Sequence, residues 1–250
     1  DMQGRKMSKS LGNGIDPLEV VNAYGADAMR FTIISQAAVG TDINLDHEDV
    51  EATFSNGRNF SNKIWNAFRL IKGWEVDECE QAESAKQAIN WFESKINKMI
   101  AEIDDSYSKY RISEALMSTY KLVWDDFCSW HLEIVKPNYG SPIDKITYAK
   151  TIEQLEKILK LLHPFMPFIS EEIWHLIDDR TNDIIVADWP KAGDVNEILL
   201  ADFEHTSEVV AGIRTIRKEQ NIAQKEQLEL LVIDNQKASN NLDAIIAKLG

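Results

Sequence analysis

The sequence predicts a mainly α-helical fold, a helical bundle with a small α/β region toward its C-terminal end. Apolar side chains recur at intervals of three or four residues over several long stretches, which is the periodicity of amphipathic helices. Short connections separate these stretches, so consecutive helices should pack as neighbours. Residues 228–233, and a short run at 184–187, are β-branched and apolar enough for strands. The composition, 44% apolar and 27% charged over 250 residues, is typical of a folded chain.

Two short helices are expected first. Asp16 followed by Pro17 is typical of a helix start, and Gly25 supplies a stop, so the sequence predicts a helix over residues 17–24. A second helix should follow directly and continue through Ile33.

A long helix is predicted over residues 48–73, after a connector at 40–46. Residues 75–83 carry five acids and few apolar side chains, and are expected to form a loop. The apolar and small residues of the long helix recur at helical spacing and should form its buried stripe: Val50, Phe54, Gly57, Ser61, Ile64, Phe68 and Ile71.

The remaining chain predicts a succession of helices. Ser84 with Gln87 three positions later is a capping-box signature, and it predicts a helix that continues to about residue 108. Prolines and glycines mark the later boundaries, as at Pro137 and Pro167. Apolar periodicity predicts the further helices over 116–134, 143–162, 169–177, 195–220 and 238–249.

The charge of the chain argues against a general affinity for nucleic acid. There are 27 basic and 41 acidic residues, a net charge of −14 and a pI near 4.8, so the average field repels a polyanion. One stretch opposes this average. Residues 52–74 contain no Asp or Glu and four basic side chains.

Within that stretch, four side chains are expected on one flank of the long helix. At 100° per residue, Arg58, Asn62, Trp65 and Arg69 fall close together beside the buried stripe. Guanidinium groups bind phosphate, an amide reads a base edge, and an indole stacks on an unpaired base, so this flank is a candidate surface for binding nucleic acid. The alternative is that Trp65 packs inward and the arginines pair with acids on neighbouring helices.

A second basic cluster lies on a later helix. Arg214, Arg217 and Lys218 are a further candidate contact for nucleic acid, although a solvated helix face is the favoured interpretation of this cluster.

The most specific string is KMSKS at residues 6–10. Lys6 and Lys9, with the hydroxyls of Ser8 and Ser10 beside them, offer ammonium and hydroxyl donors suited to phosphate oxygens. A lysine is useful where negative charge grows on a leaving pyrophosphate. The simpler interpretation of such a run is a frayed basic terminus, but five matching residues arise rarely by chance.

With this string in place, the sequence resembles the class I aminoacyl-tRNA synthetases of the valine, isoleucine and leucine group, and within it the valine enzymes. The likeness covers nearly the whole chain. It is carried by residues 13–17 (NGIDP), 24–31 (YGADAMRF), 40–46 (GTDINLD), 57–60 (GRNF), 62–67 (NKIWNA), 130–137 (WHLEIVKP), 163–168 (HPFMPF), 171–174 (EEIW) and 213–222.

The resemblance implies a division into three parts. Residues 1–47 would be the end of a catalytic region with its KMSKS loop, 48–222 a helical anticodon-binding domain, and 223–250 the start of a C-terminal α/β region. The nucleotide-binding fold and the editing domain of this family find no counterpart in the sequence, so we expect the chain to be a piece of a longer protein.

The resemblance also implies partners and a site. Such enzymes ligate valine to its tRNA with ATP and Mg, and the loop lysines assist adenylate formation, so it assigns Lys9, and more weakly Lys6, as catalytic residues, with Ser8 and Ser10 beside the ATP phosphates. The chain alone is expected to be inactive, to bind no ATP, and to grip the anticodon arm of tRNA.

The cysteine count and the hydropathy indicate the cellular compartment in which we expect the protein. Cys79 and Cys128 lie in no paired-cysteine spacing, and no apolar run reaches the length of a membrane helix. We therefore expect a reducing, cytoplasmic setting with no membrane partner.

Other candidate sites favour structural interpretations. Glu172 and His175 have the spacing of di-iron bundles, but the sequence contains no second copy of that motif. Cys128 and His131 are expected to be a core thiol and a hydrogen-bonded imidazole, and His163 a helix-ending residue that bonds locally. Three alternatives stay open: an isoleucine-type synthetase, a helical protein-interaction scaffold and, less well supported, a free-standing di-iron enzyme.

Overall fold

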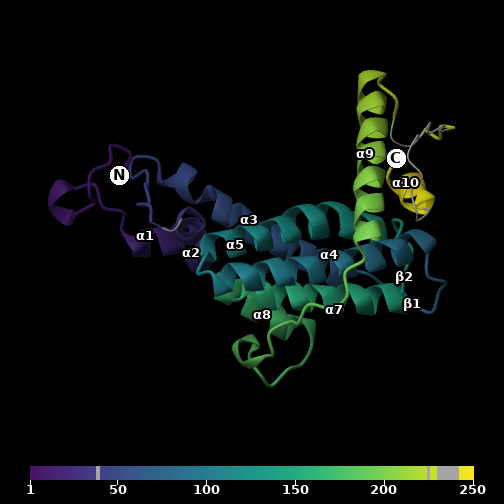
Figure 1. The fold of residues 1–250 in the computed structure, drawn as a ribbon, viewed down its shortest axis with the longest axis horizontal. Coiled ribbons are helices and arrows are strands. Elements are labelled where there is room, and N and C mark those ends of the chain that lie inside the picture. Colours follow the sequence, from purple (N-terminus) through teal and green to yellow (C-terminus); the bar gives the residue numbers. More distant parts are fainter. Residues whose placement is uncertain (38–39, 224–225, 230–241) are drawn as a thin grey trace.

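The computed structural model describes residues 1–37, 40–223, 226–229 and 242–250, and it shows an elongated helical molecule (Figure 1). The N-terminal segment, purple in Figure 1, lies at one end of the long axis, and the helices of a bundle fill the middle. Helix α9 stands across the bundle near the other end, beside α10. None of the helices in the described ranges is long and apolar enough to cross a membrane.

The N-terminal helices pack against α3. Helix α1 (Pro17–Tyr24) begins where the Asp16 carboxylate accepts a 2.9 Å hydrogen bond from the Leu18 N–H, as the sequence predicted. Helices α2 (Ala26–Gln36) and α3 (Val50–Lys72) follow, also as predicted. Before them, a single 3₁₀ turn, η1 (Lys9–Leu11), lies within the KMSKS segment.

The buried face of α3 differs in detail from the predicted stripe. Val50 and Ser61 are only half-buried, whereas Phe60 and Ala67 are buried. The buried face is wider than a single stripe of residues spaced three or four apart. The reason is that α3 is contacted by α2, α7, α8 and the π-helical segment described next.

The bundle consists of long helices joined by short turns. They are α4 (Glu83–Ser108), α5 (Ile112–Lys121), the π-helix η2 (Leu122–His131), α6 (Leu132–Val135), α7 (Lys145–Leu162) and α8 (Pro167–Ile177). Elements α5, η2 and α6 form one continuous helical path, where the sequence predicted one helix. Their apolar faces meet in a single core, with fully buried Phe92, Phe127 and Leu116 at its centre.

Three local predictions were wrong. The N-cap of α4 is Ala82, and Ser84 lies buried in the first turn with no capping bond, because the chain enters α4 two residues earlier than the capping box required. The loop at 75–83 contains strand β1 (Val76–Asp77), which pairs in parallel with β2 (Ile143–Asp144). Residues 184–187 form the 3₁₀ turn η3 (Ile184–Val186) and not a strand.

The C-terminal part contains α9 (Glu197–Glu219) and α10 (Asp243–Leu249). The side chain of Asn196 accepts the Leu199 N–H at 3.0 Å and begins α9. Of the predicted strand at 228–233, the first two residues are not in a strand, and the rest lie outside the described residues.

Candidate functional site

The KMSKS segment forms a short, capped loop. Ser8 is the N-cap of η1, and its hydroxyl oxygen accepts the Leu11 N–H at 3.3 Å and lies 3.1 Å from the Ser10 hydroxyl. Lys6 and Lys9 are exposed, and neither ammonium group has a partner among the residues that the structure describes. Within the described residues, the loop therefore presents two unpaired cations and two hydroxyls, and its binding of phosphate stays a prediction.

Asn13 holds this loop in shape, which the sequence reasoning missed. Its side-chain oxygen accepts the Ser8 N–H at 2.8 Å, and its amide donates to the Asp1 carboxylate at 2.8 Å. The Asn13 side chain is buried although the loop is exposed. An asparagine between two glycines in the string that follows KMSKS was the available signal.

A pocket of about 330 Å³ lies directly beside the loop. Met7, Ser8 and Lys9 line it together with apolar side chains of α1, α2 and α3, among them Val20 and Phe54, and with residues of the connecting segments. The cationic loop thus borders an apolar hollow, an arrangement that suits a ligand with a phosphate and an apolar or aromatic part.

On α3, the predicted flank is present because the helix is continuous over its four positions. Arg58 lies at its N-terminal end and pairs with Glu51 at 2.6 Å, and its guanidinium lies 5.5 Å from the centre of the Tyr24 ring. The hydrogen bond from Arg58 lowers the pKa of the Glu51 carboxyl. Both side chains remain substantially exposed, so the pair is open to competition from a phosphate.

The other three members differ in exposure. Trp65 is half-buried against the core, and its ring centre lies 5.7 Å from that of Phe68. Asn62 and Arg69 are exposed, and neither side chain has a hydrogen-bond or ion-pair partner within the described ranges. The flank thus offers one unpaired guanidinium, one paired guanidinium, an amide and the outer edge of an indole.

The cluster on α9 has structural partners. The Arg217 guanidinium donates to the backbone carbonyls of Gly250, Ala223 and Glu226 at 2.8, 2.9 and 3.0 Å. Arg214 donates to the Leu249 carbonyl at 3.3 Å and lies 5.7 Å from the Trp130 ring centre. Lys218 is exposed. Two of the three cations therefore hold the C-terminal segment against α9.

Two charged residues of α2 connect the loop-bearing helices to the bundle, and the sequence reasoning did not single them out. Arg30 donates to the carbonyls of Phe165 and Pro164 at 3.0 and 2.9 Å. The Asp27 carboxylate accepts the backbone N–H groups of Phe168 and Ile169 at 3.3 and 2.7 Å.

Burial raises the pKa of Asp27, although these two N–H donors act in the opposite sense. Asp27 and Arg30 both belong to the string YGADAMRF at residues 24–31. Their partners lie in or next to the string HPFMPF at residues 163–168, so two segments that are far apart in the sequence form one contact.

Cys128, His163 and His131 were predicted to be structural residues, and the predicted contact of one of them was wrong. Cys128 is buried, and burial raises its pKa to about 12. His163 ends α7 and its Nδ1 lies 2.8 Å from the Ser170 hydroxyl, as predicted. His131 is fully buried but neither ring nitrogen makes a side-chain hydrogen bond within the described part of the chain, so the prediction of a hydrogen-bonded imidazole was wrong.

Comparison with known proteins places these features in a family. Residues 90–232 match the anticodon-binding domain of tRNA ligase, and residues 1–46 match the class I tRNA synthetases for I, L, M and V. A valine–tRNA ligase of Christiangramia forsetii is 51% identical over 253 aligned residues that cover 100% of this chain. Those of Phocaeicola vulgatus and Thermotoga maritima are 54% and 36% identical over 93% of it. The chain spans 26–28% of the length of these relatives.

Among solved structures, the fold is similar to LeuRS of Agrobacterium radiobacter K84 in a ternary complex with tRNA and LeuAMS. The TM-score is 0.55 at 22% identity, over 80% of this chain and 23% of that one. A bundle of this topology, a KMSKS loop at residues 6–10 and a family match over more than half of the chain agree with one another. The chain belongs to the anticodon-binding domain family of tRNA ligases, with a class I tRNA synthetase segment at residues 1–46.

Proposed function

We propose that this chain is part of a valine–tRNA ligase and that its bundle binds the anticodon arm of tRNA while its KMSKS loop meets ATP. The observation that carries this proposal is the identity of about half of the residues to valine–tRNA ligases along the entire chain, loop and bundle together. These relatives favour valine over the isoleucine-type alternative, and the match to an anticodon-binding domain favours tRNA binding over an interaction scaffold. We also propose that it acts in the cytoplasm, where tRNA, ATP and valine are present.

The loop suits the role of a phosphate-binding element. Lys6 and Lys9 are exposed and unpaired among the described residues, so they can approach anionic oxygens without first breaking an ion pair. The Ser8 and Ser10 hydroxyls can donate to the same anion, and Asn13 restricts the loop in advance. ATP with Mg would supply the activated phosphate, and these side chains would bind and orient it.

The α3 flank is the proposed tRNA contact. In a chain of net charge −14, a polyanion needs a local cationic surface, and residues 52–74 provide the long acid-free one. Arg69 would neutralise a phosphate directly. Arg58 would leave its ion pair with Glu51 and bind a phosphate in its place. Trp65, with only its outer part exposed, can add a stacking contact at its edge. Arg214, Arg217 and Lys218 are the second candidate surface, with Lys218 the member whose side chain is unpaired within the described ranges.

Full-length protein with the change Lys9→Ala tests the loop. Valine-dependent exchange of pyrophosphate into ATP should fall by a factor of about 100 to 1000, the usual loss of one transition-state charge donor, while tRNA affinity stays unchanged. Lys121→Ala is the matched control, because Lys121 is an exposed lysine at the end of α5. Pyrophosphate exchange that is as fast in Lys9→Ala as in the control would refute the assignment of Lys9. Exchange that depends on isoleucine and not on valine would show that isoleucine is the substrate.

Arg69→Ala tests the flank. Its affinity for tRNA should fall, and the loss should shrink as salt rises, because one phosphate contact fewer releases fewer counterions. Arg111→Ala is the matched control, since Arg111 is an exposed arginine that lies outside the acid-free stretch. Equal salt slopes for Arg69→Ala, Arg111→Ala and the unmodified protein would move the tRNA surface elsewhere, and Lys218→Ala would be measured next.

A further inference from the structure

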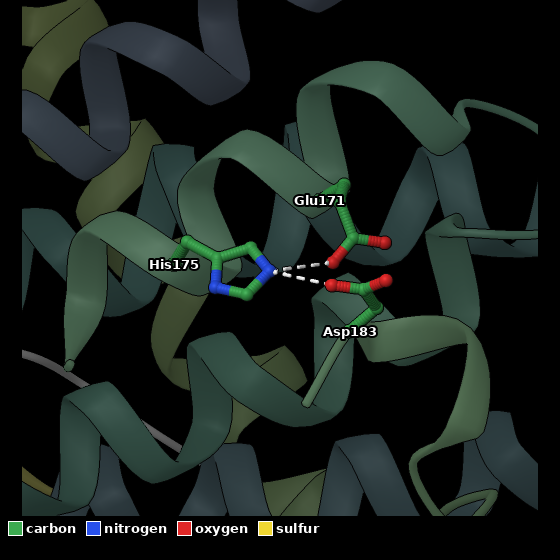
Figure 2. A group of neighbouring side chains, drawn as sticks. All are labelled: Glu171, His175 and Asp183. Carbon is green, nitrogen blue, oxygen red and sulfur yellow. Dashed lines mark hydrogen bonds and ion pairs between the residues drawn. The ribbon is translucent and has the colours of Figure 1, made fainter. Parts of the chain in front are cut away.

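We propose that Glu171, His175 and Asp183 form a binding site for a divalent zinc ion. Figure 2 shows the three side chains converging on one point at the surface of the bundle. The His175 Nε2 atom lies 3.1 Å from Glu171 Oε1 and 3.1 Å from Asp183 Oδ1. The three candidate ligand atoms all lie within 4.8 Å of one another.

These separations suit a metal of zinc's size. Zinc bonds of about 2.0–2.2 Å at tetrahedral angles place neighbouring ligand atoms about 3.3–3.5 Å apart. The two measured distances are shorter by only a few tenths of an ångström, so small side-chain rotations would admit the ion. One imidazole nitrogen and two carboxylate oxygens are ligand types that zinc accepts, and solvent can supply the fourth ligand because Asp183 is 66% exposed.

The local fold holds the ligands in place without a metal. Glu171 and His175 stand four positions apart on α8 and therefore share one helix face. Asp183 precedes η3 and returns to the same face after the turn at 178–182. The backbone N–H of Ile184 donates to Glu171 Oε1 at 2.9 Å, which leaves that oxygen a further lone pair and orients the carboxylate.

The turn that carries Asp183 is anchored independently. The Trp174 indole donates to the Asn182 carbonyl at 3.1 Å, and the Arg180 guanidinium lies 3.7 Å from the centre of the same Trp174 ring. Arg180 also pairs with Glu156 of α7. The chain therefore brings Asp183 back to α8 by contacts that do not involve the proposed ligands, as a preformed site requires.

The charge of the cluster favours a dication. Two carboxylates and a neutral imidazole carry a formal charge of −2, which a zinc ion balances, whereas a proton on His175 balances only half of it. The sequence did not reveal this site, because the motif considered there joined His175 to Glu172. Glu172 is exposed and is not one of the three converging groups. A bound zinc would clip the turn at 178–183 to α8.

The test uses the protein stripped of metal with a chelator and titrated with zinc chloride in a calorimeter, with bound zinc counted after dialysis. The unmodified protein should bind one equivalent more than His175→Ala. Glu171→Gln and Asp183→Asn should weaken this binding at least tenfold, and Glu171→Gln keeps the oxygen that accepts the Ile184 N–H. Glu172→Gln, a neighbouring exposed acid on the same helix, is the matched control and should bind as the unmodified protein does.

A second readout separates specific binding from general attraction to an acidic surface. Zinc should slow amide exchange at Ile184 in the unmodified protein and in Glu172→Gln, and should leave it unchanged in His175→Ala. Equal zinc stoichiometry and affinity in the unmodified protein and His175→Ala, or equal amide exchange at Ile184 with and without zinc, would overturn the proposal. Circular dichroism verifies that each variant is folded.

Discussion

His131 is an imidazole enclosed by aromatic rings in the centre of the bundle. Its ring centre lies 4.8 Å from that of Phe92 and 5.6 Å from that of Phe127, at interplanar angles of 30° and 15°. Burial lowers its pKa to about 3, and the nearby backbone of Ala88 opposes this shift only in part. The folded protein therefore holds His131 neutral across the physiological range.

This gives a prediction for acid stability. The unfolded chain protonates this histidine near its ordinary pKa of about 6.5, and the folded chain only near 3. The stability that a neutral His131 contributes is thus present above about pH 6.5 and is lost as the pH falls toward 3. Between pH 6.5 and 4.5 the loss should approach 2–3 kcal/mol, at about 1.4 kcal/mol per pH unit.

The measurement compares urea denaturation of the unmodified protein and His131→Phe over that range. An apolar ring keeps the stacking and does not titrate, so the variant should lose less stability on acidification. The difference between the two curves removes other titrating groups, including Asp126, whose pKa burial raises to about 6 despite its 3.4 Å ion pair with Lys95. Parallel curves would contradict the prediction.

Single residues also show why the candidate site was only partly predictable. The lysines of the KMSKS loop could be singled out because the signal is a contiguous string of residues. The partner of Arg58 could not, because the acid that it meets lies seven residues earlier on the same helix and not on a neighbouring one. The cluster of Glu171, His175 and Asp183 joins a helix to a returning turn, and sequence spacing carries no information about such a return.

At the scale of elements, Gly57 permits the crossing of α2 and α3. A Cβ atom at this position would lie 2.5 Å from the Ala28 carbonyl oxygen and 2.8 Å from the Ala28 Cα, both backbone atoms that cannot rotate away. The sequence placed Gly57 on the buried stripe of α3, but the helix that approaches it was not predictable from the spacing of either helix alone.

Gly57→Ala should therefore lower the free energy of unfolding by about 1–3 kcal/mol or more, since the two helices must separate to admit the methyl group. Gly212→Ala on α9 is the control, because the same atom there meets open space. That variant should be neutral or more stable by about 0.5–1 kcal/mol, as alanine suits a helix better than glycine. Equal denaturation midpoints for the two variants would show that the α2–α3 contact is not tight.

The positions of most helices were predicted from the sequence, whereas the π-helical segment and the two short strands were not. Helices α1, α2, α3, α4 and α7 were predicted as helices from apolar periodicity and boundary residues, although the cap predicted for α4 was wrong. The π-helical segment at Leu122–His131 was not foreseen, because its apolar side chains keep nearly helical spacing and the wider turn shows only in the backbone bonds. The two-residue strands β1 and β2 depend on each other across 67 positions, 76 to 143, and neither is a strand on local grounds.

At the scale of the whole molecule, the contact of α2 with the turn between α7 and α8 links the KMSKS segment to the bundle. The sequence predicted both parts and the order in which they occur, but not this joint, because its residues lie about 135 positions apart. Asp27 and Arg30, one turn apart on α2, meet backbone groups on the two sides of the same turn. The joint is therefore held by two oppositely charged side chains and not by apolar packing alone.

If the chain acts as proposed, this joint should transmit the position of the bundle to the loop. Arg30→Ala removes two charge-assisted hydrogen bonds and leaves the partly buried Phe165 carbonyl without its donor, whereas the exposed Pro164 carbonyl can bond to water. The change should cost about 1–3 kcal/mol of stability. In the full-length protein, the rate of valine transfer to tRNA should fall by more than the affinity for tRNA, because Arg30 lies on neither proposed binding surface. Arg30→Lys keeps a positive charge that can reach one of the two carbonyls, so its aminoacylation rate should lie between those of Arg30→Ala and the unmodified protein.

Aminoacylation rates and tRNA dissociation constants for both variants, with Arg111→Ala as the control, measure this effect. A proportional loss of rate and affinity, or no loss of either in a folded Arg30→Ala protein, would mean that the loop takes its position from the packing of α2 on α3 and not from this joint.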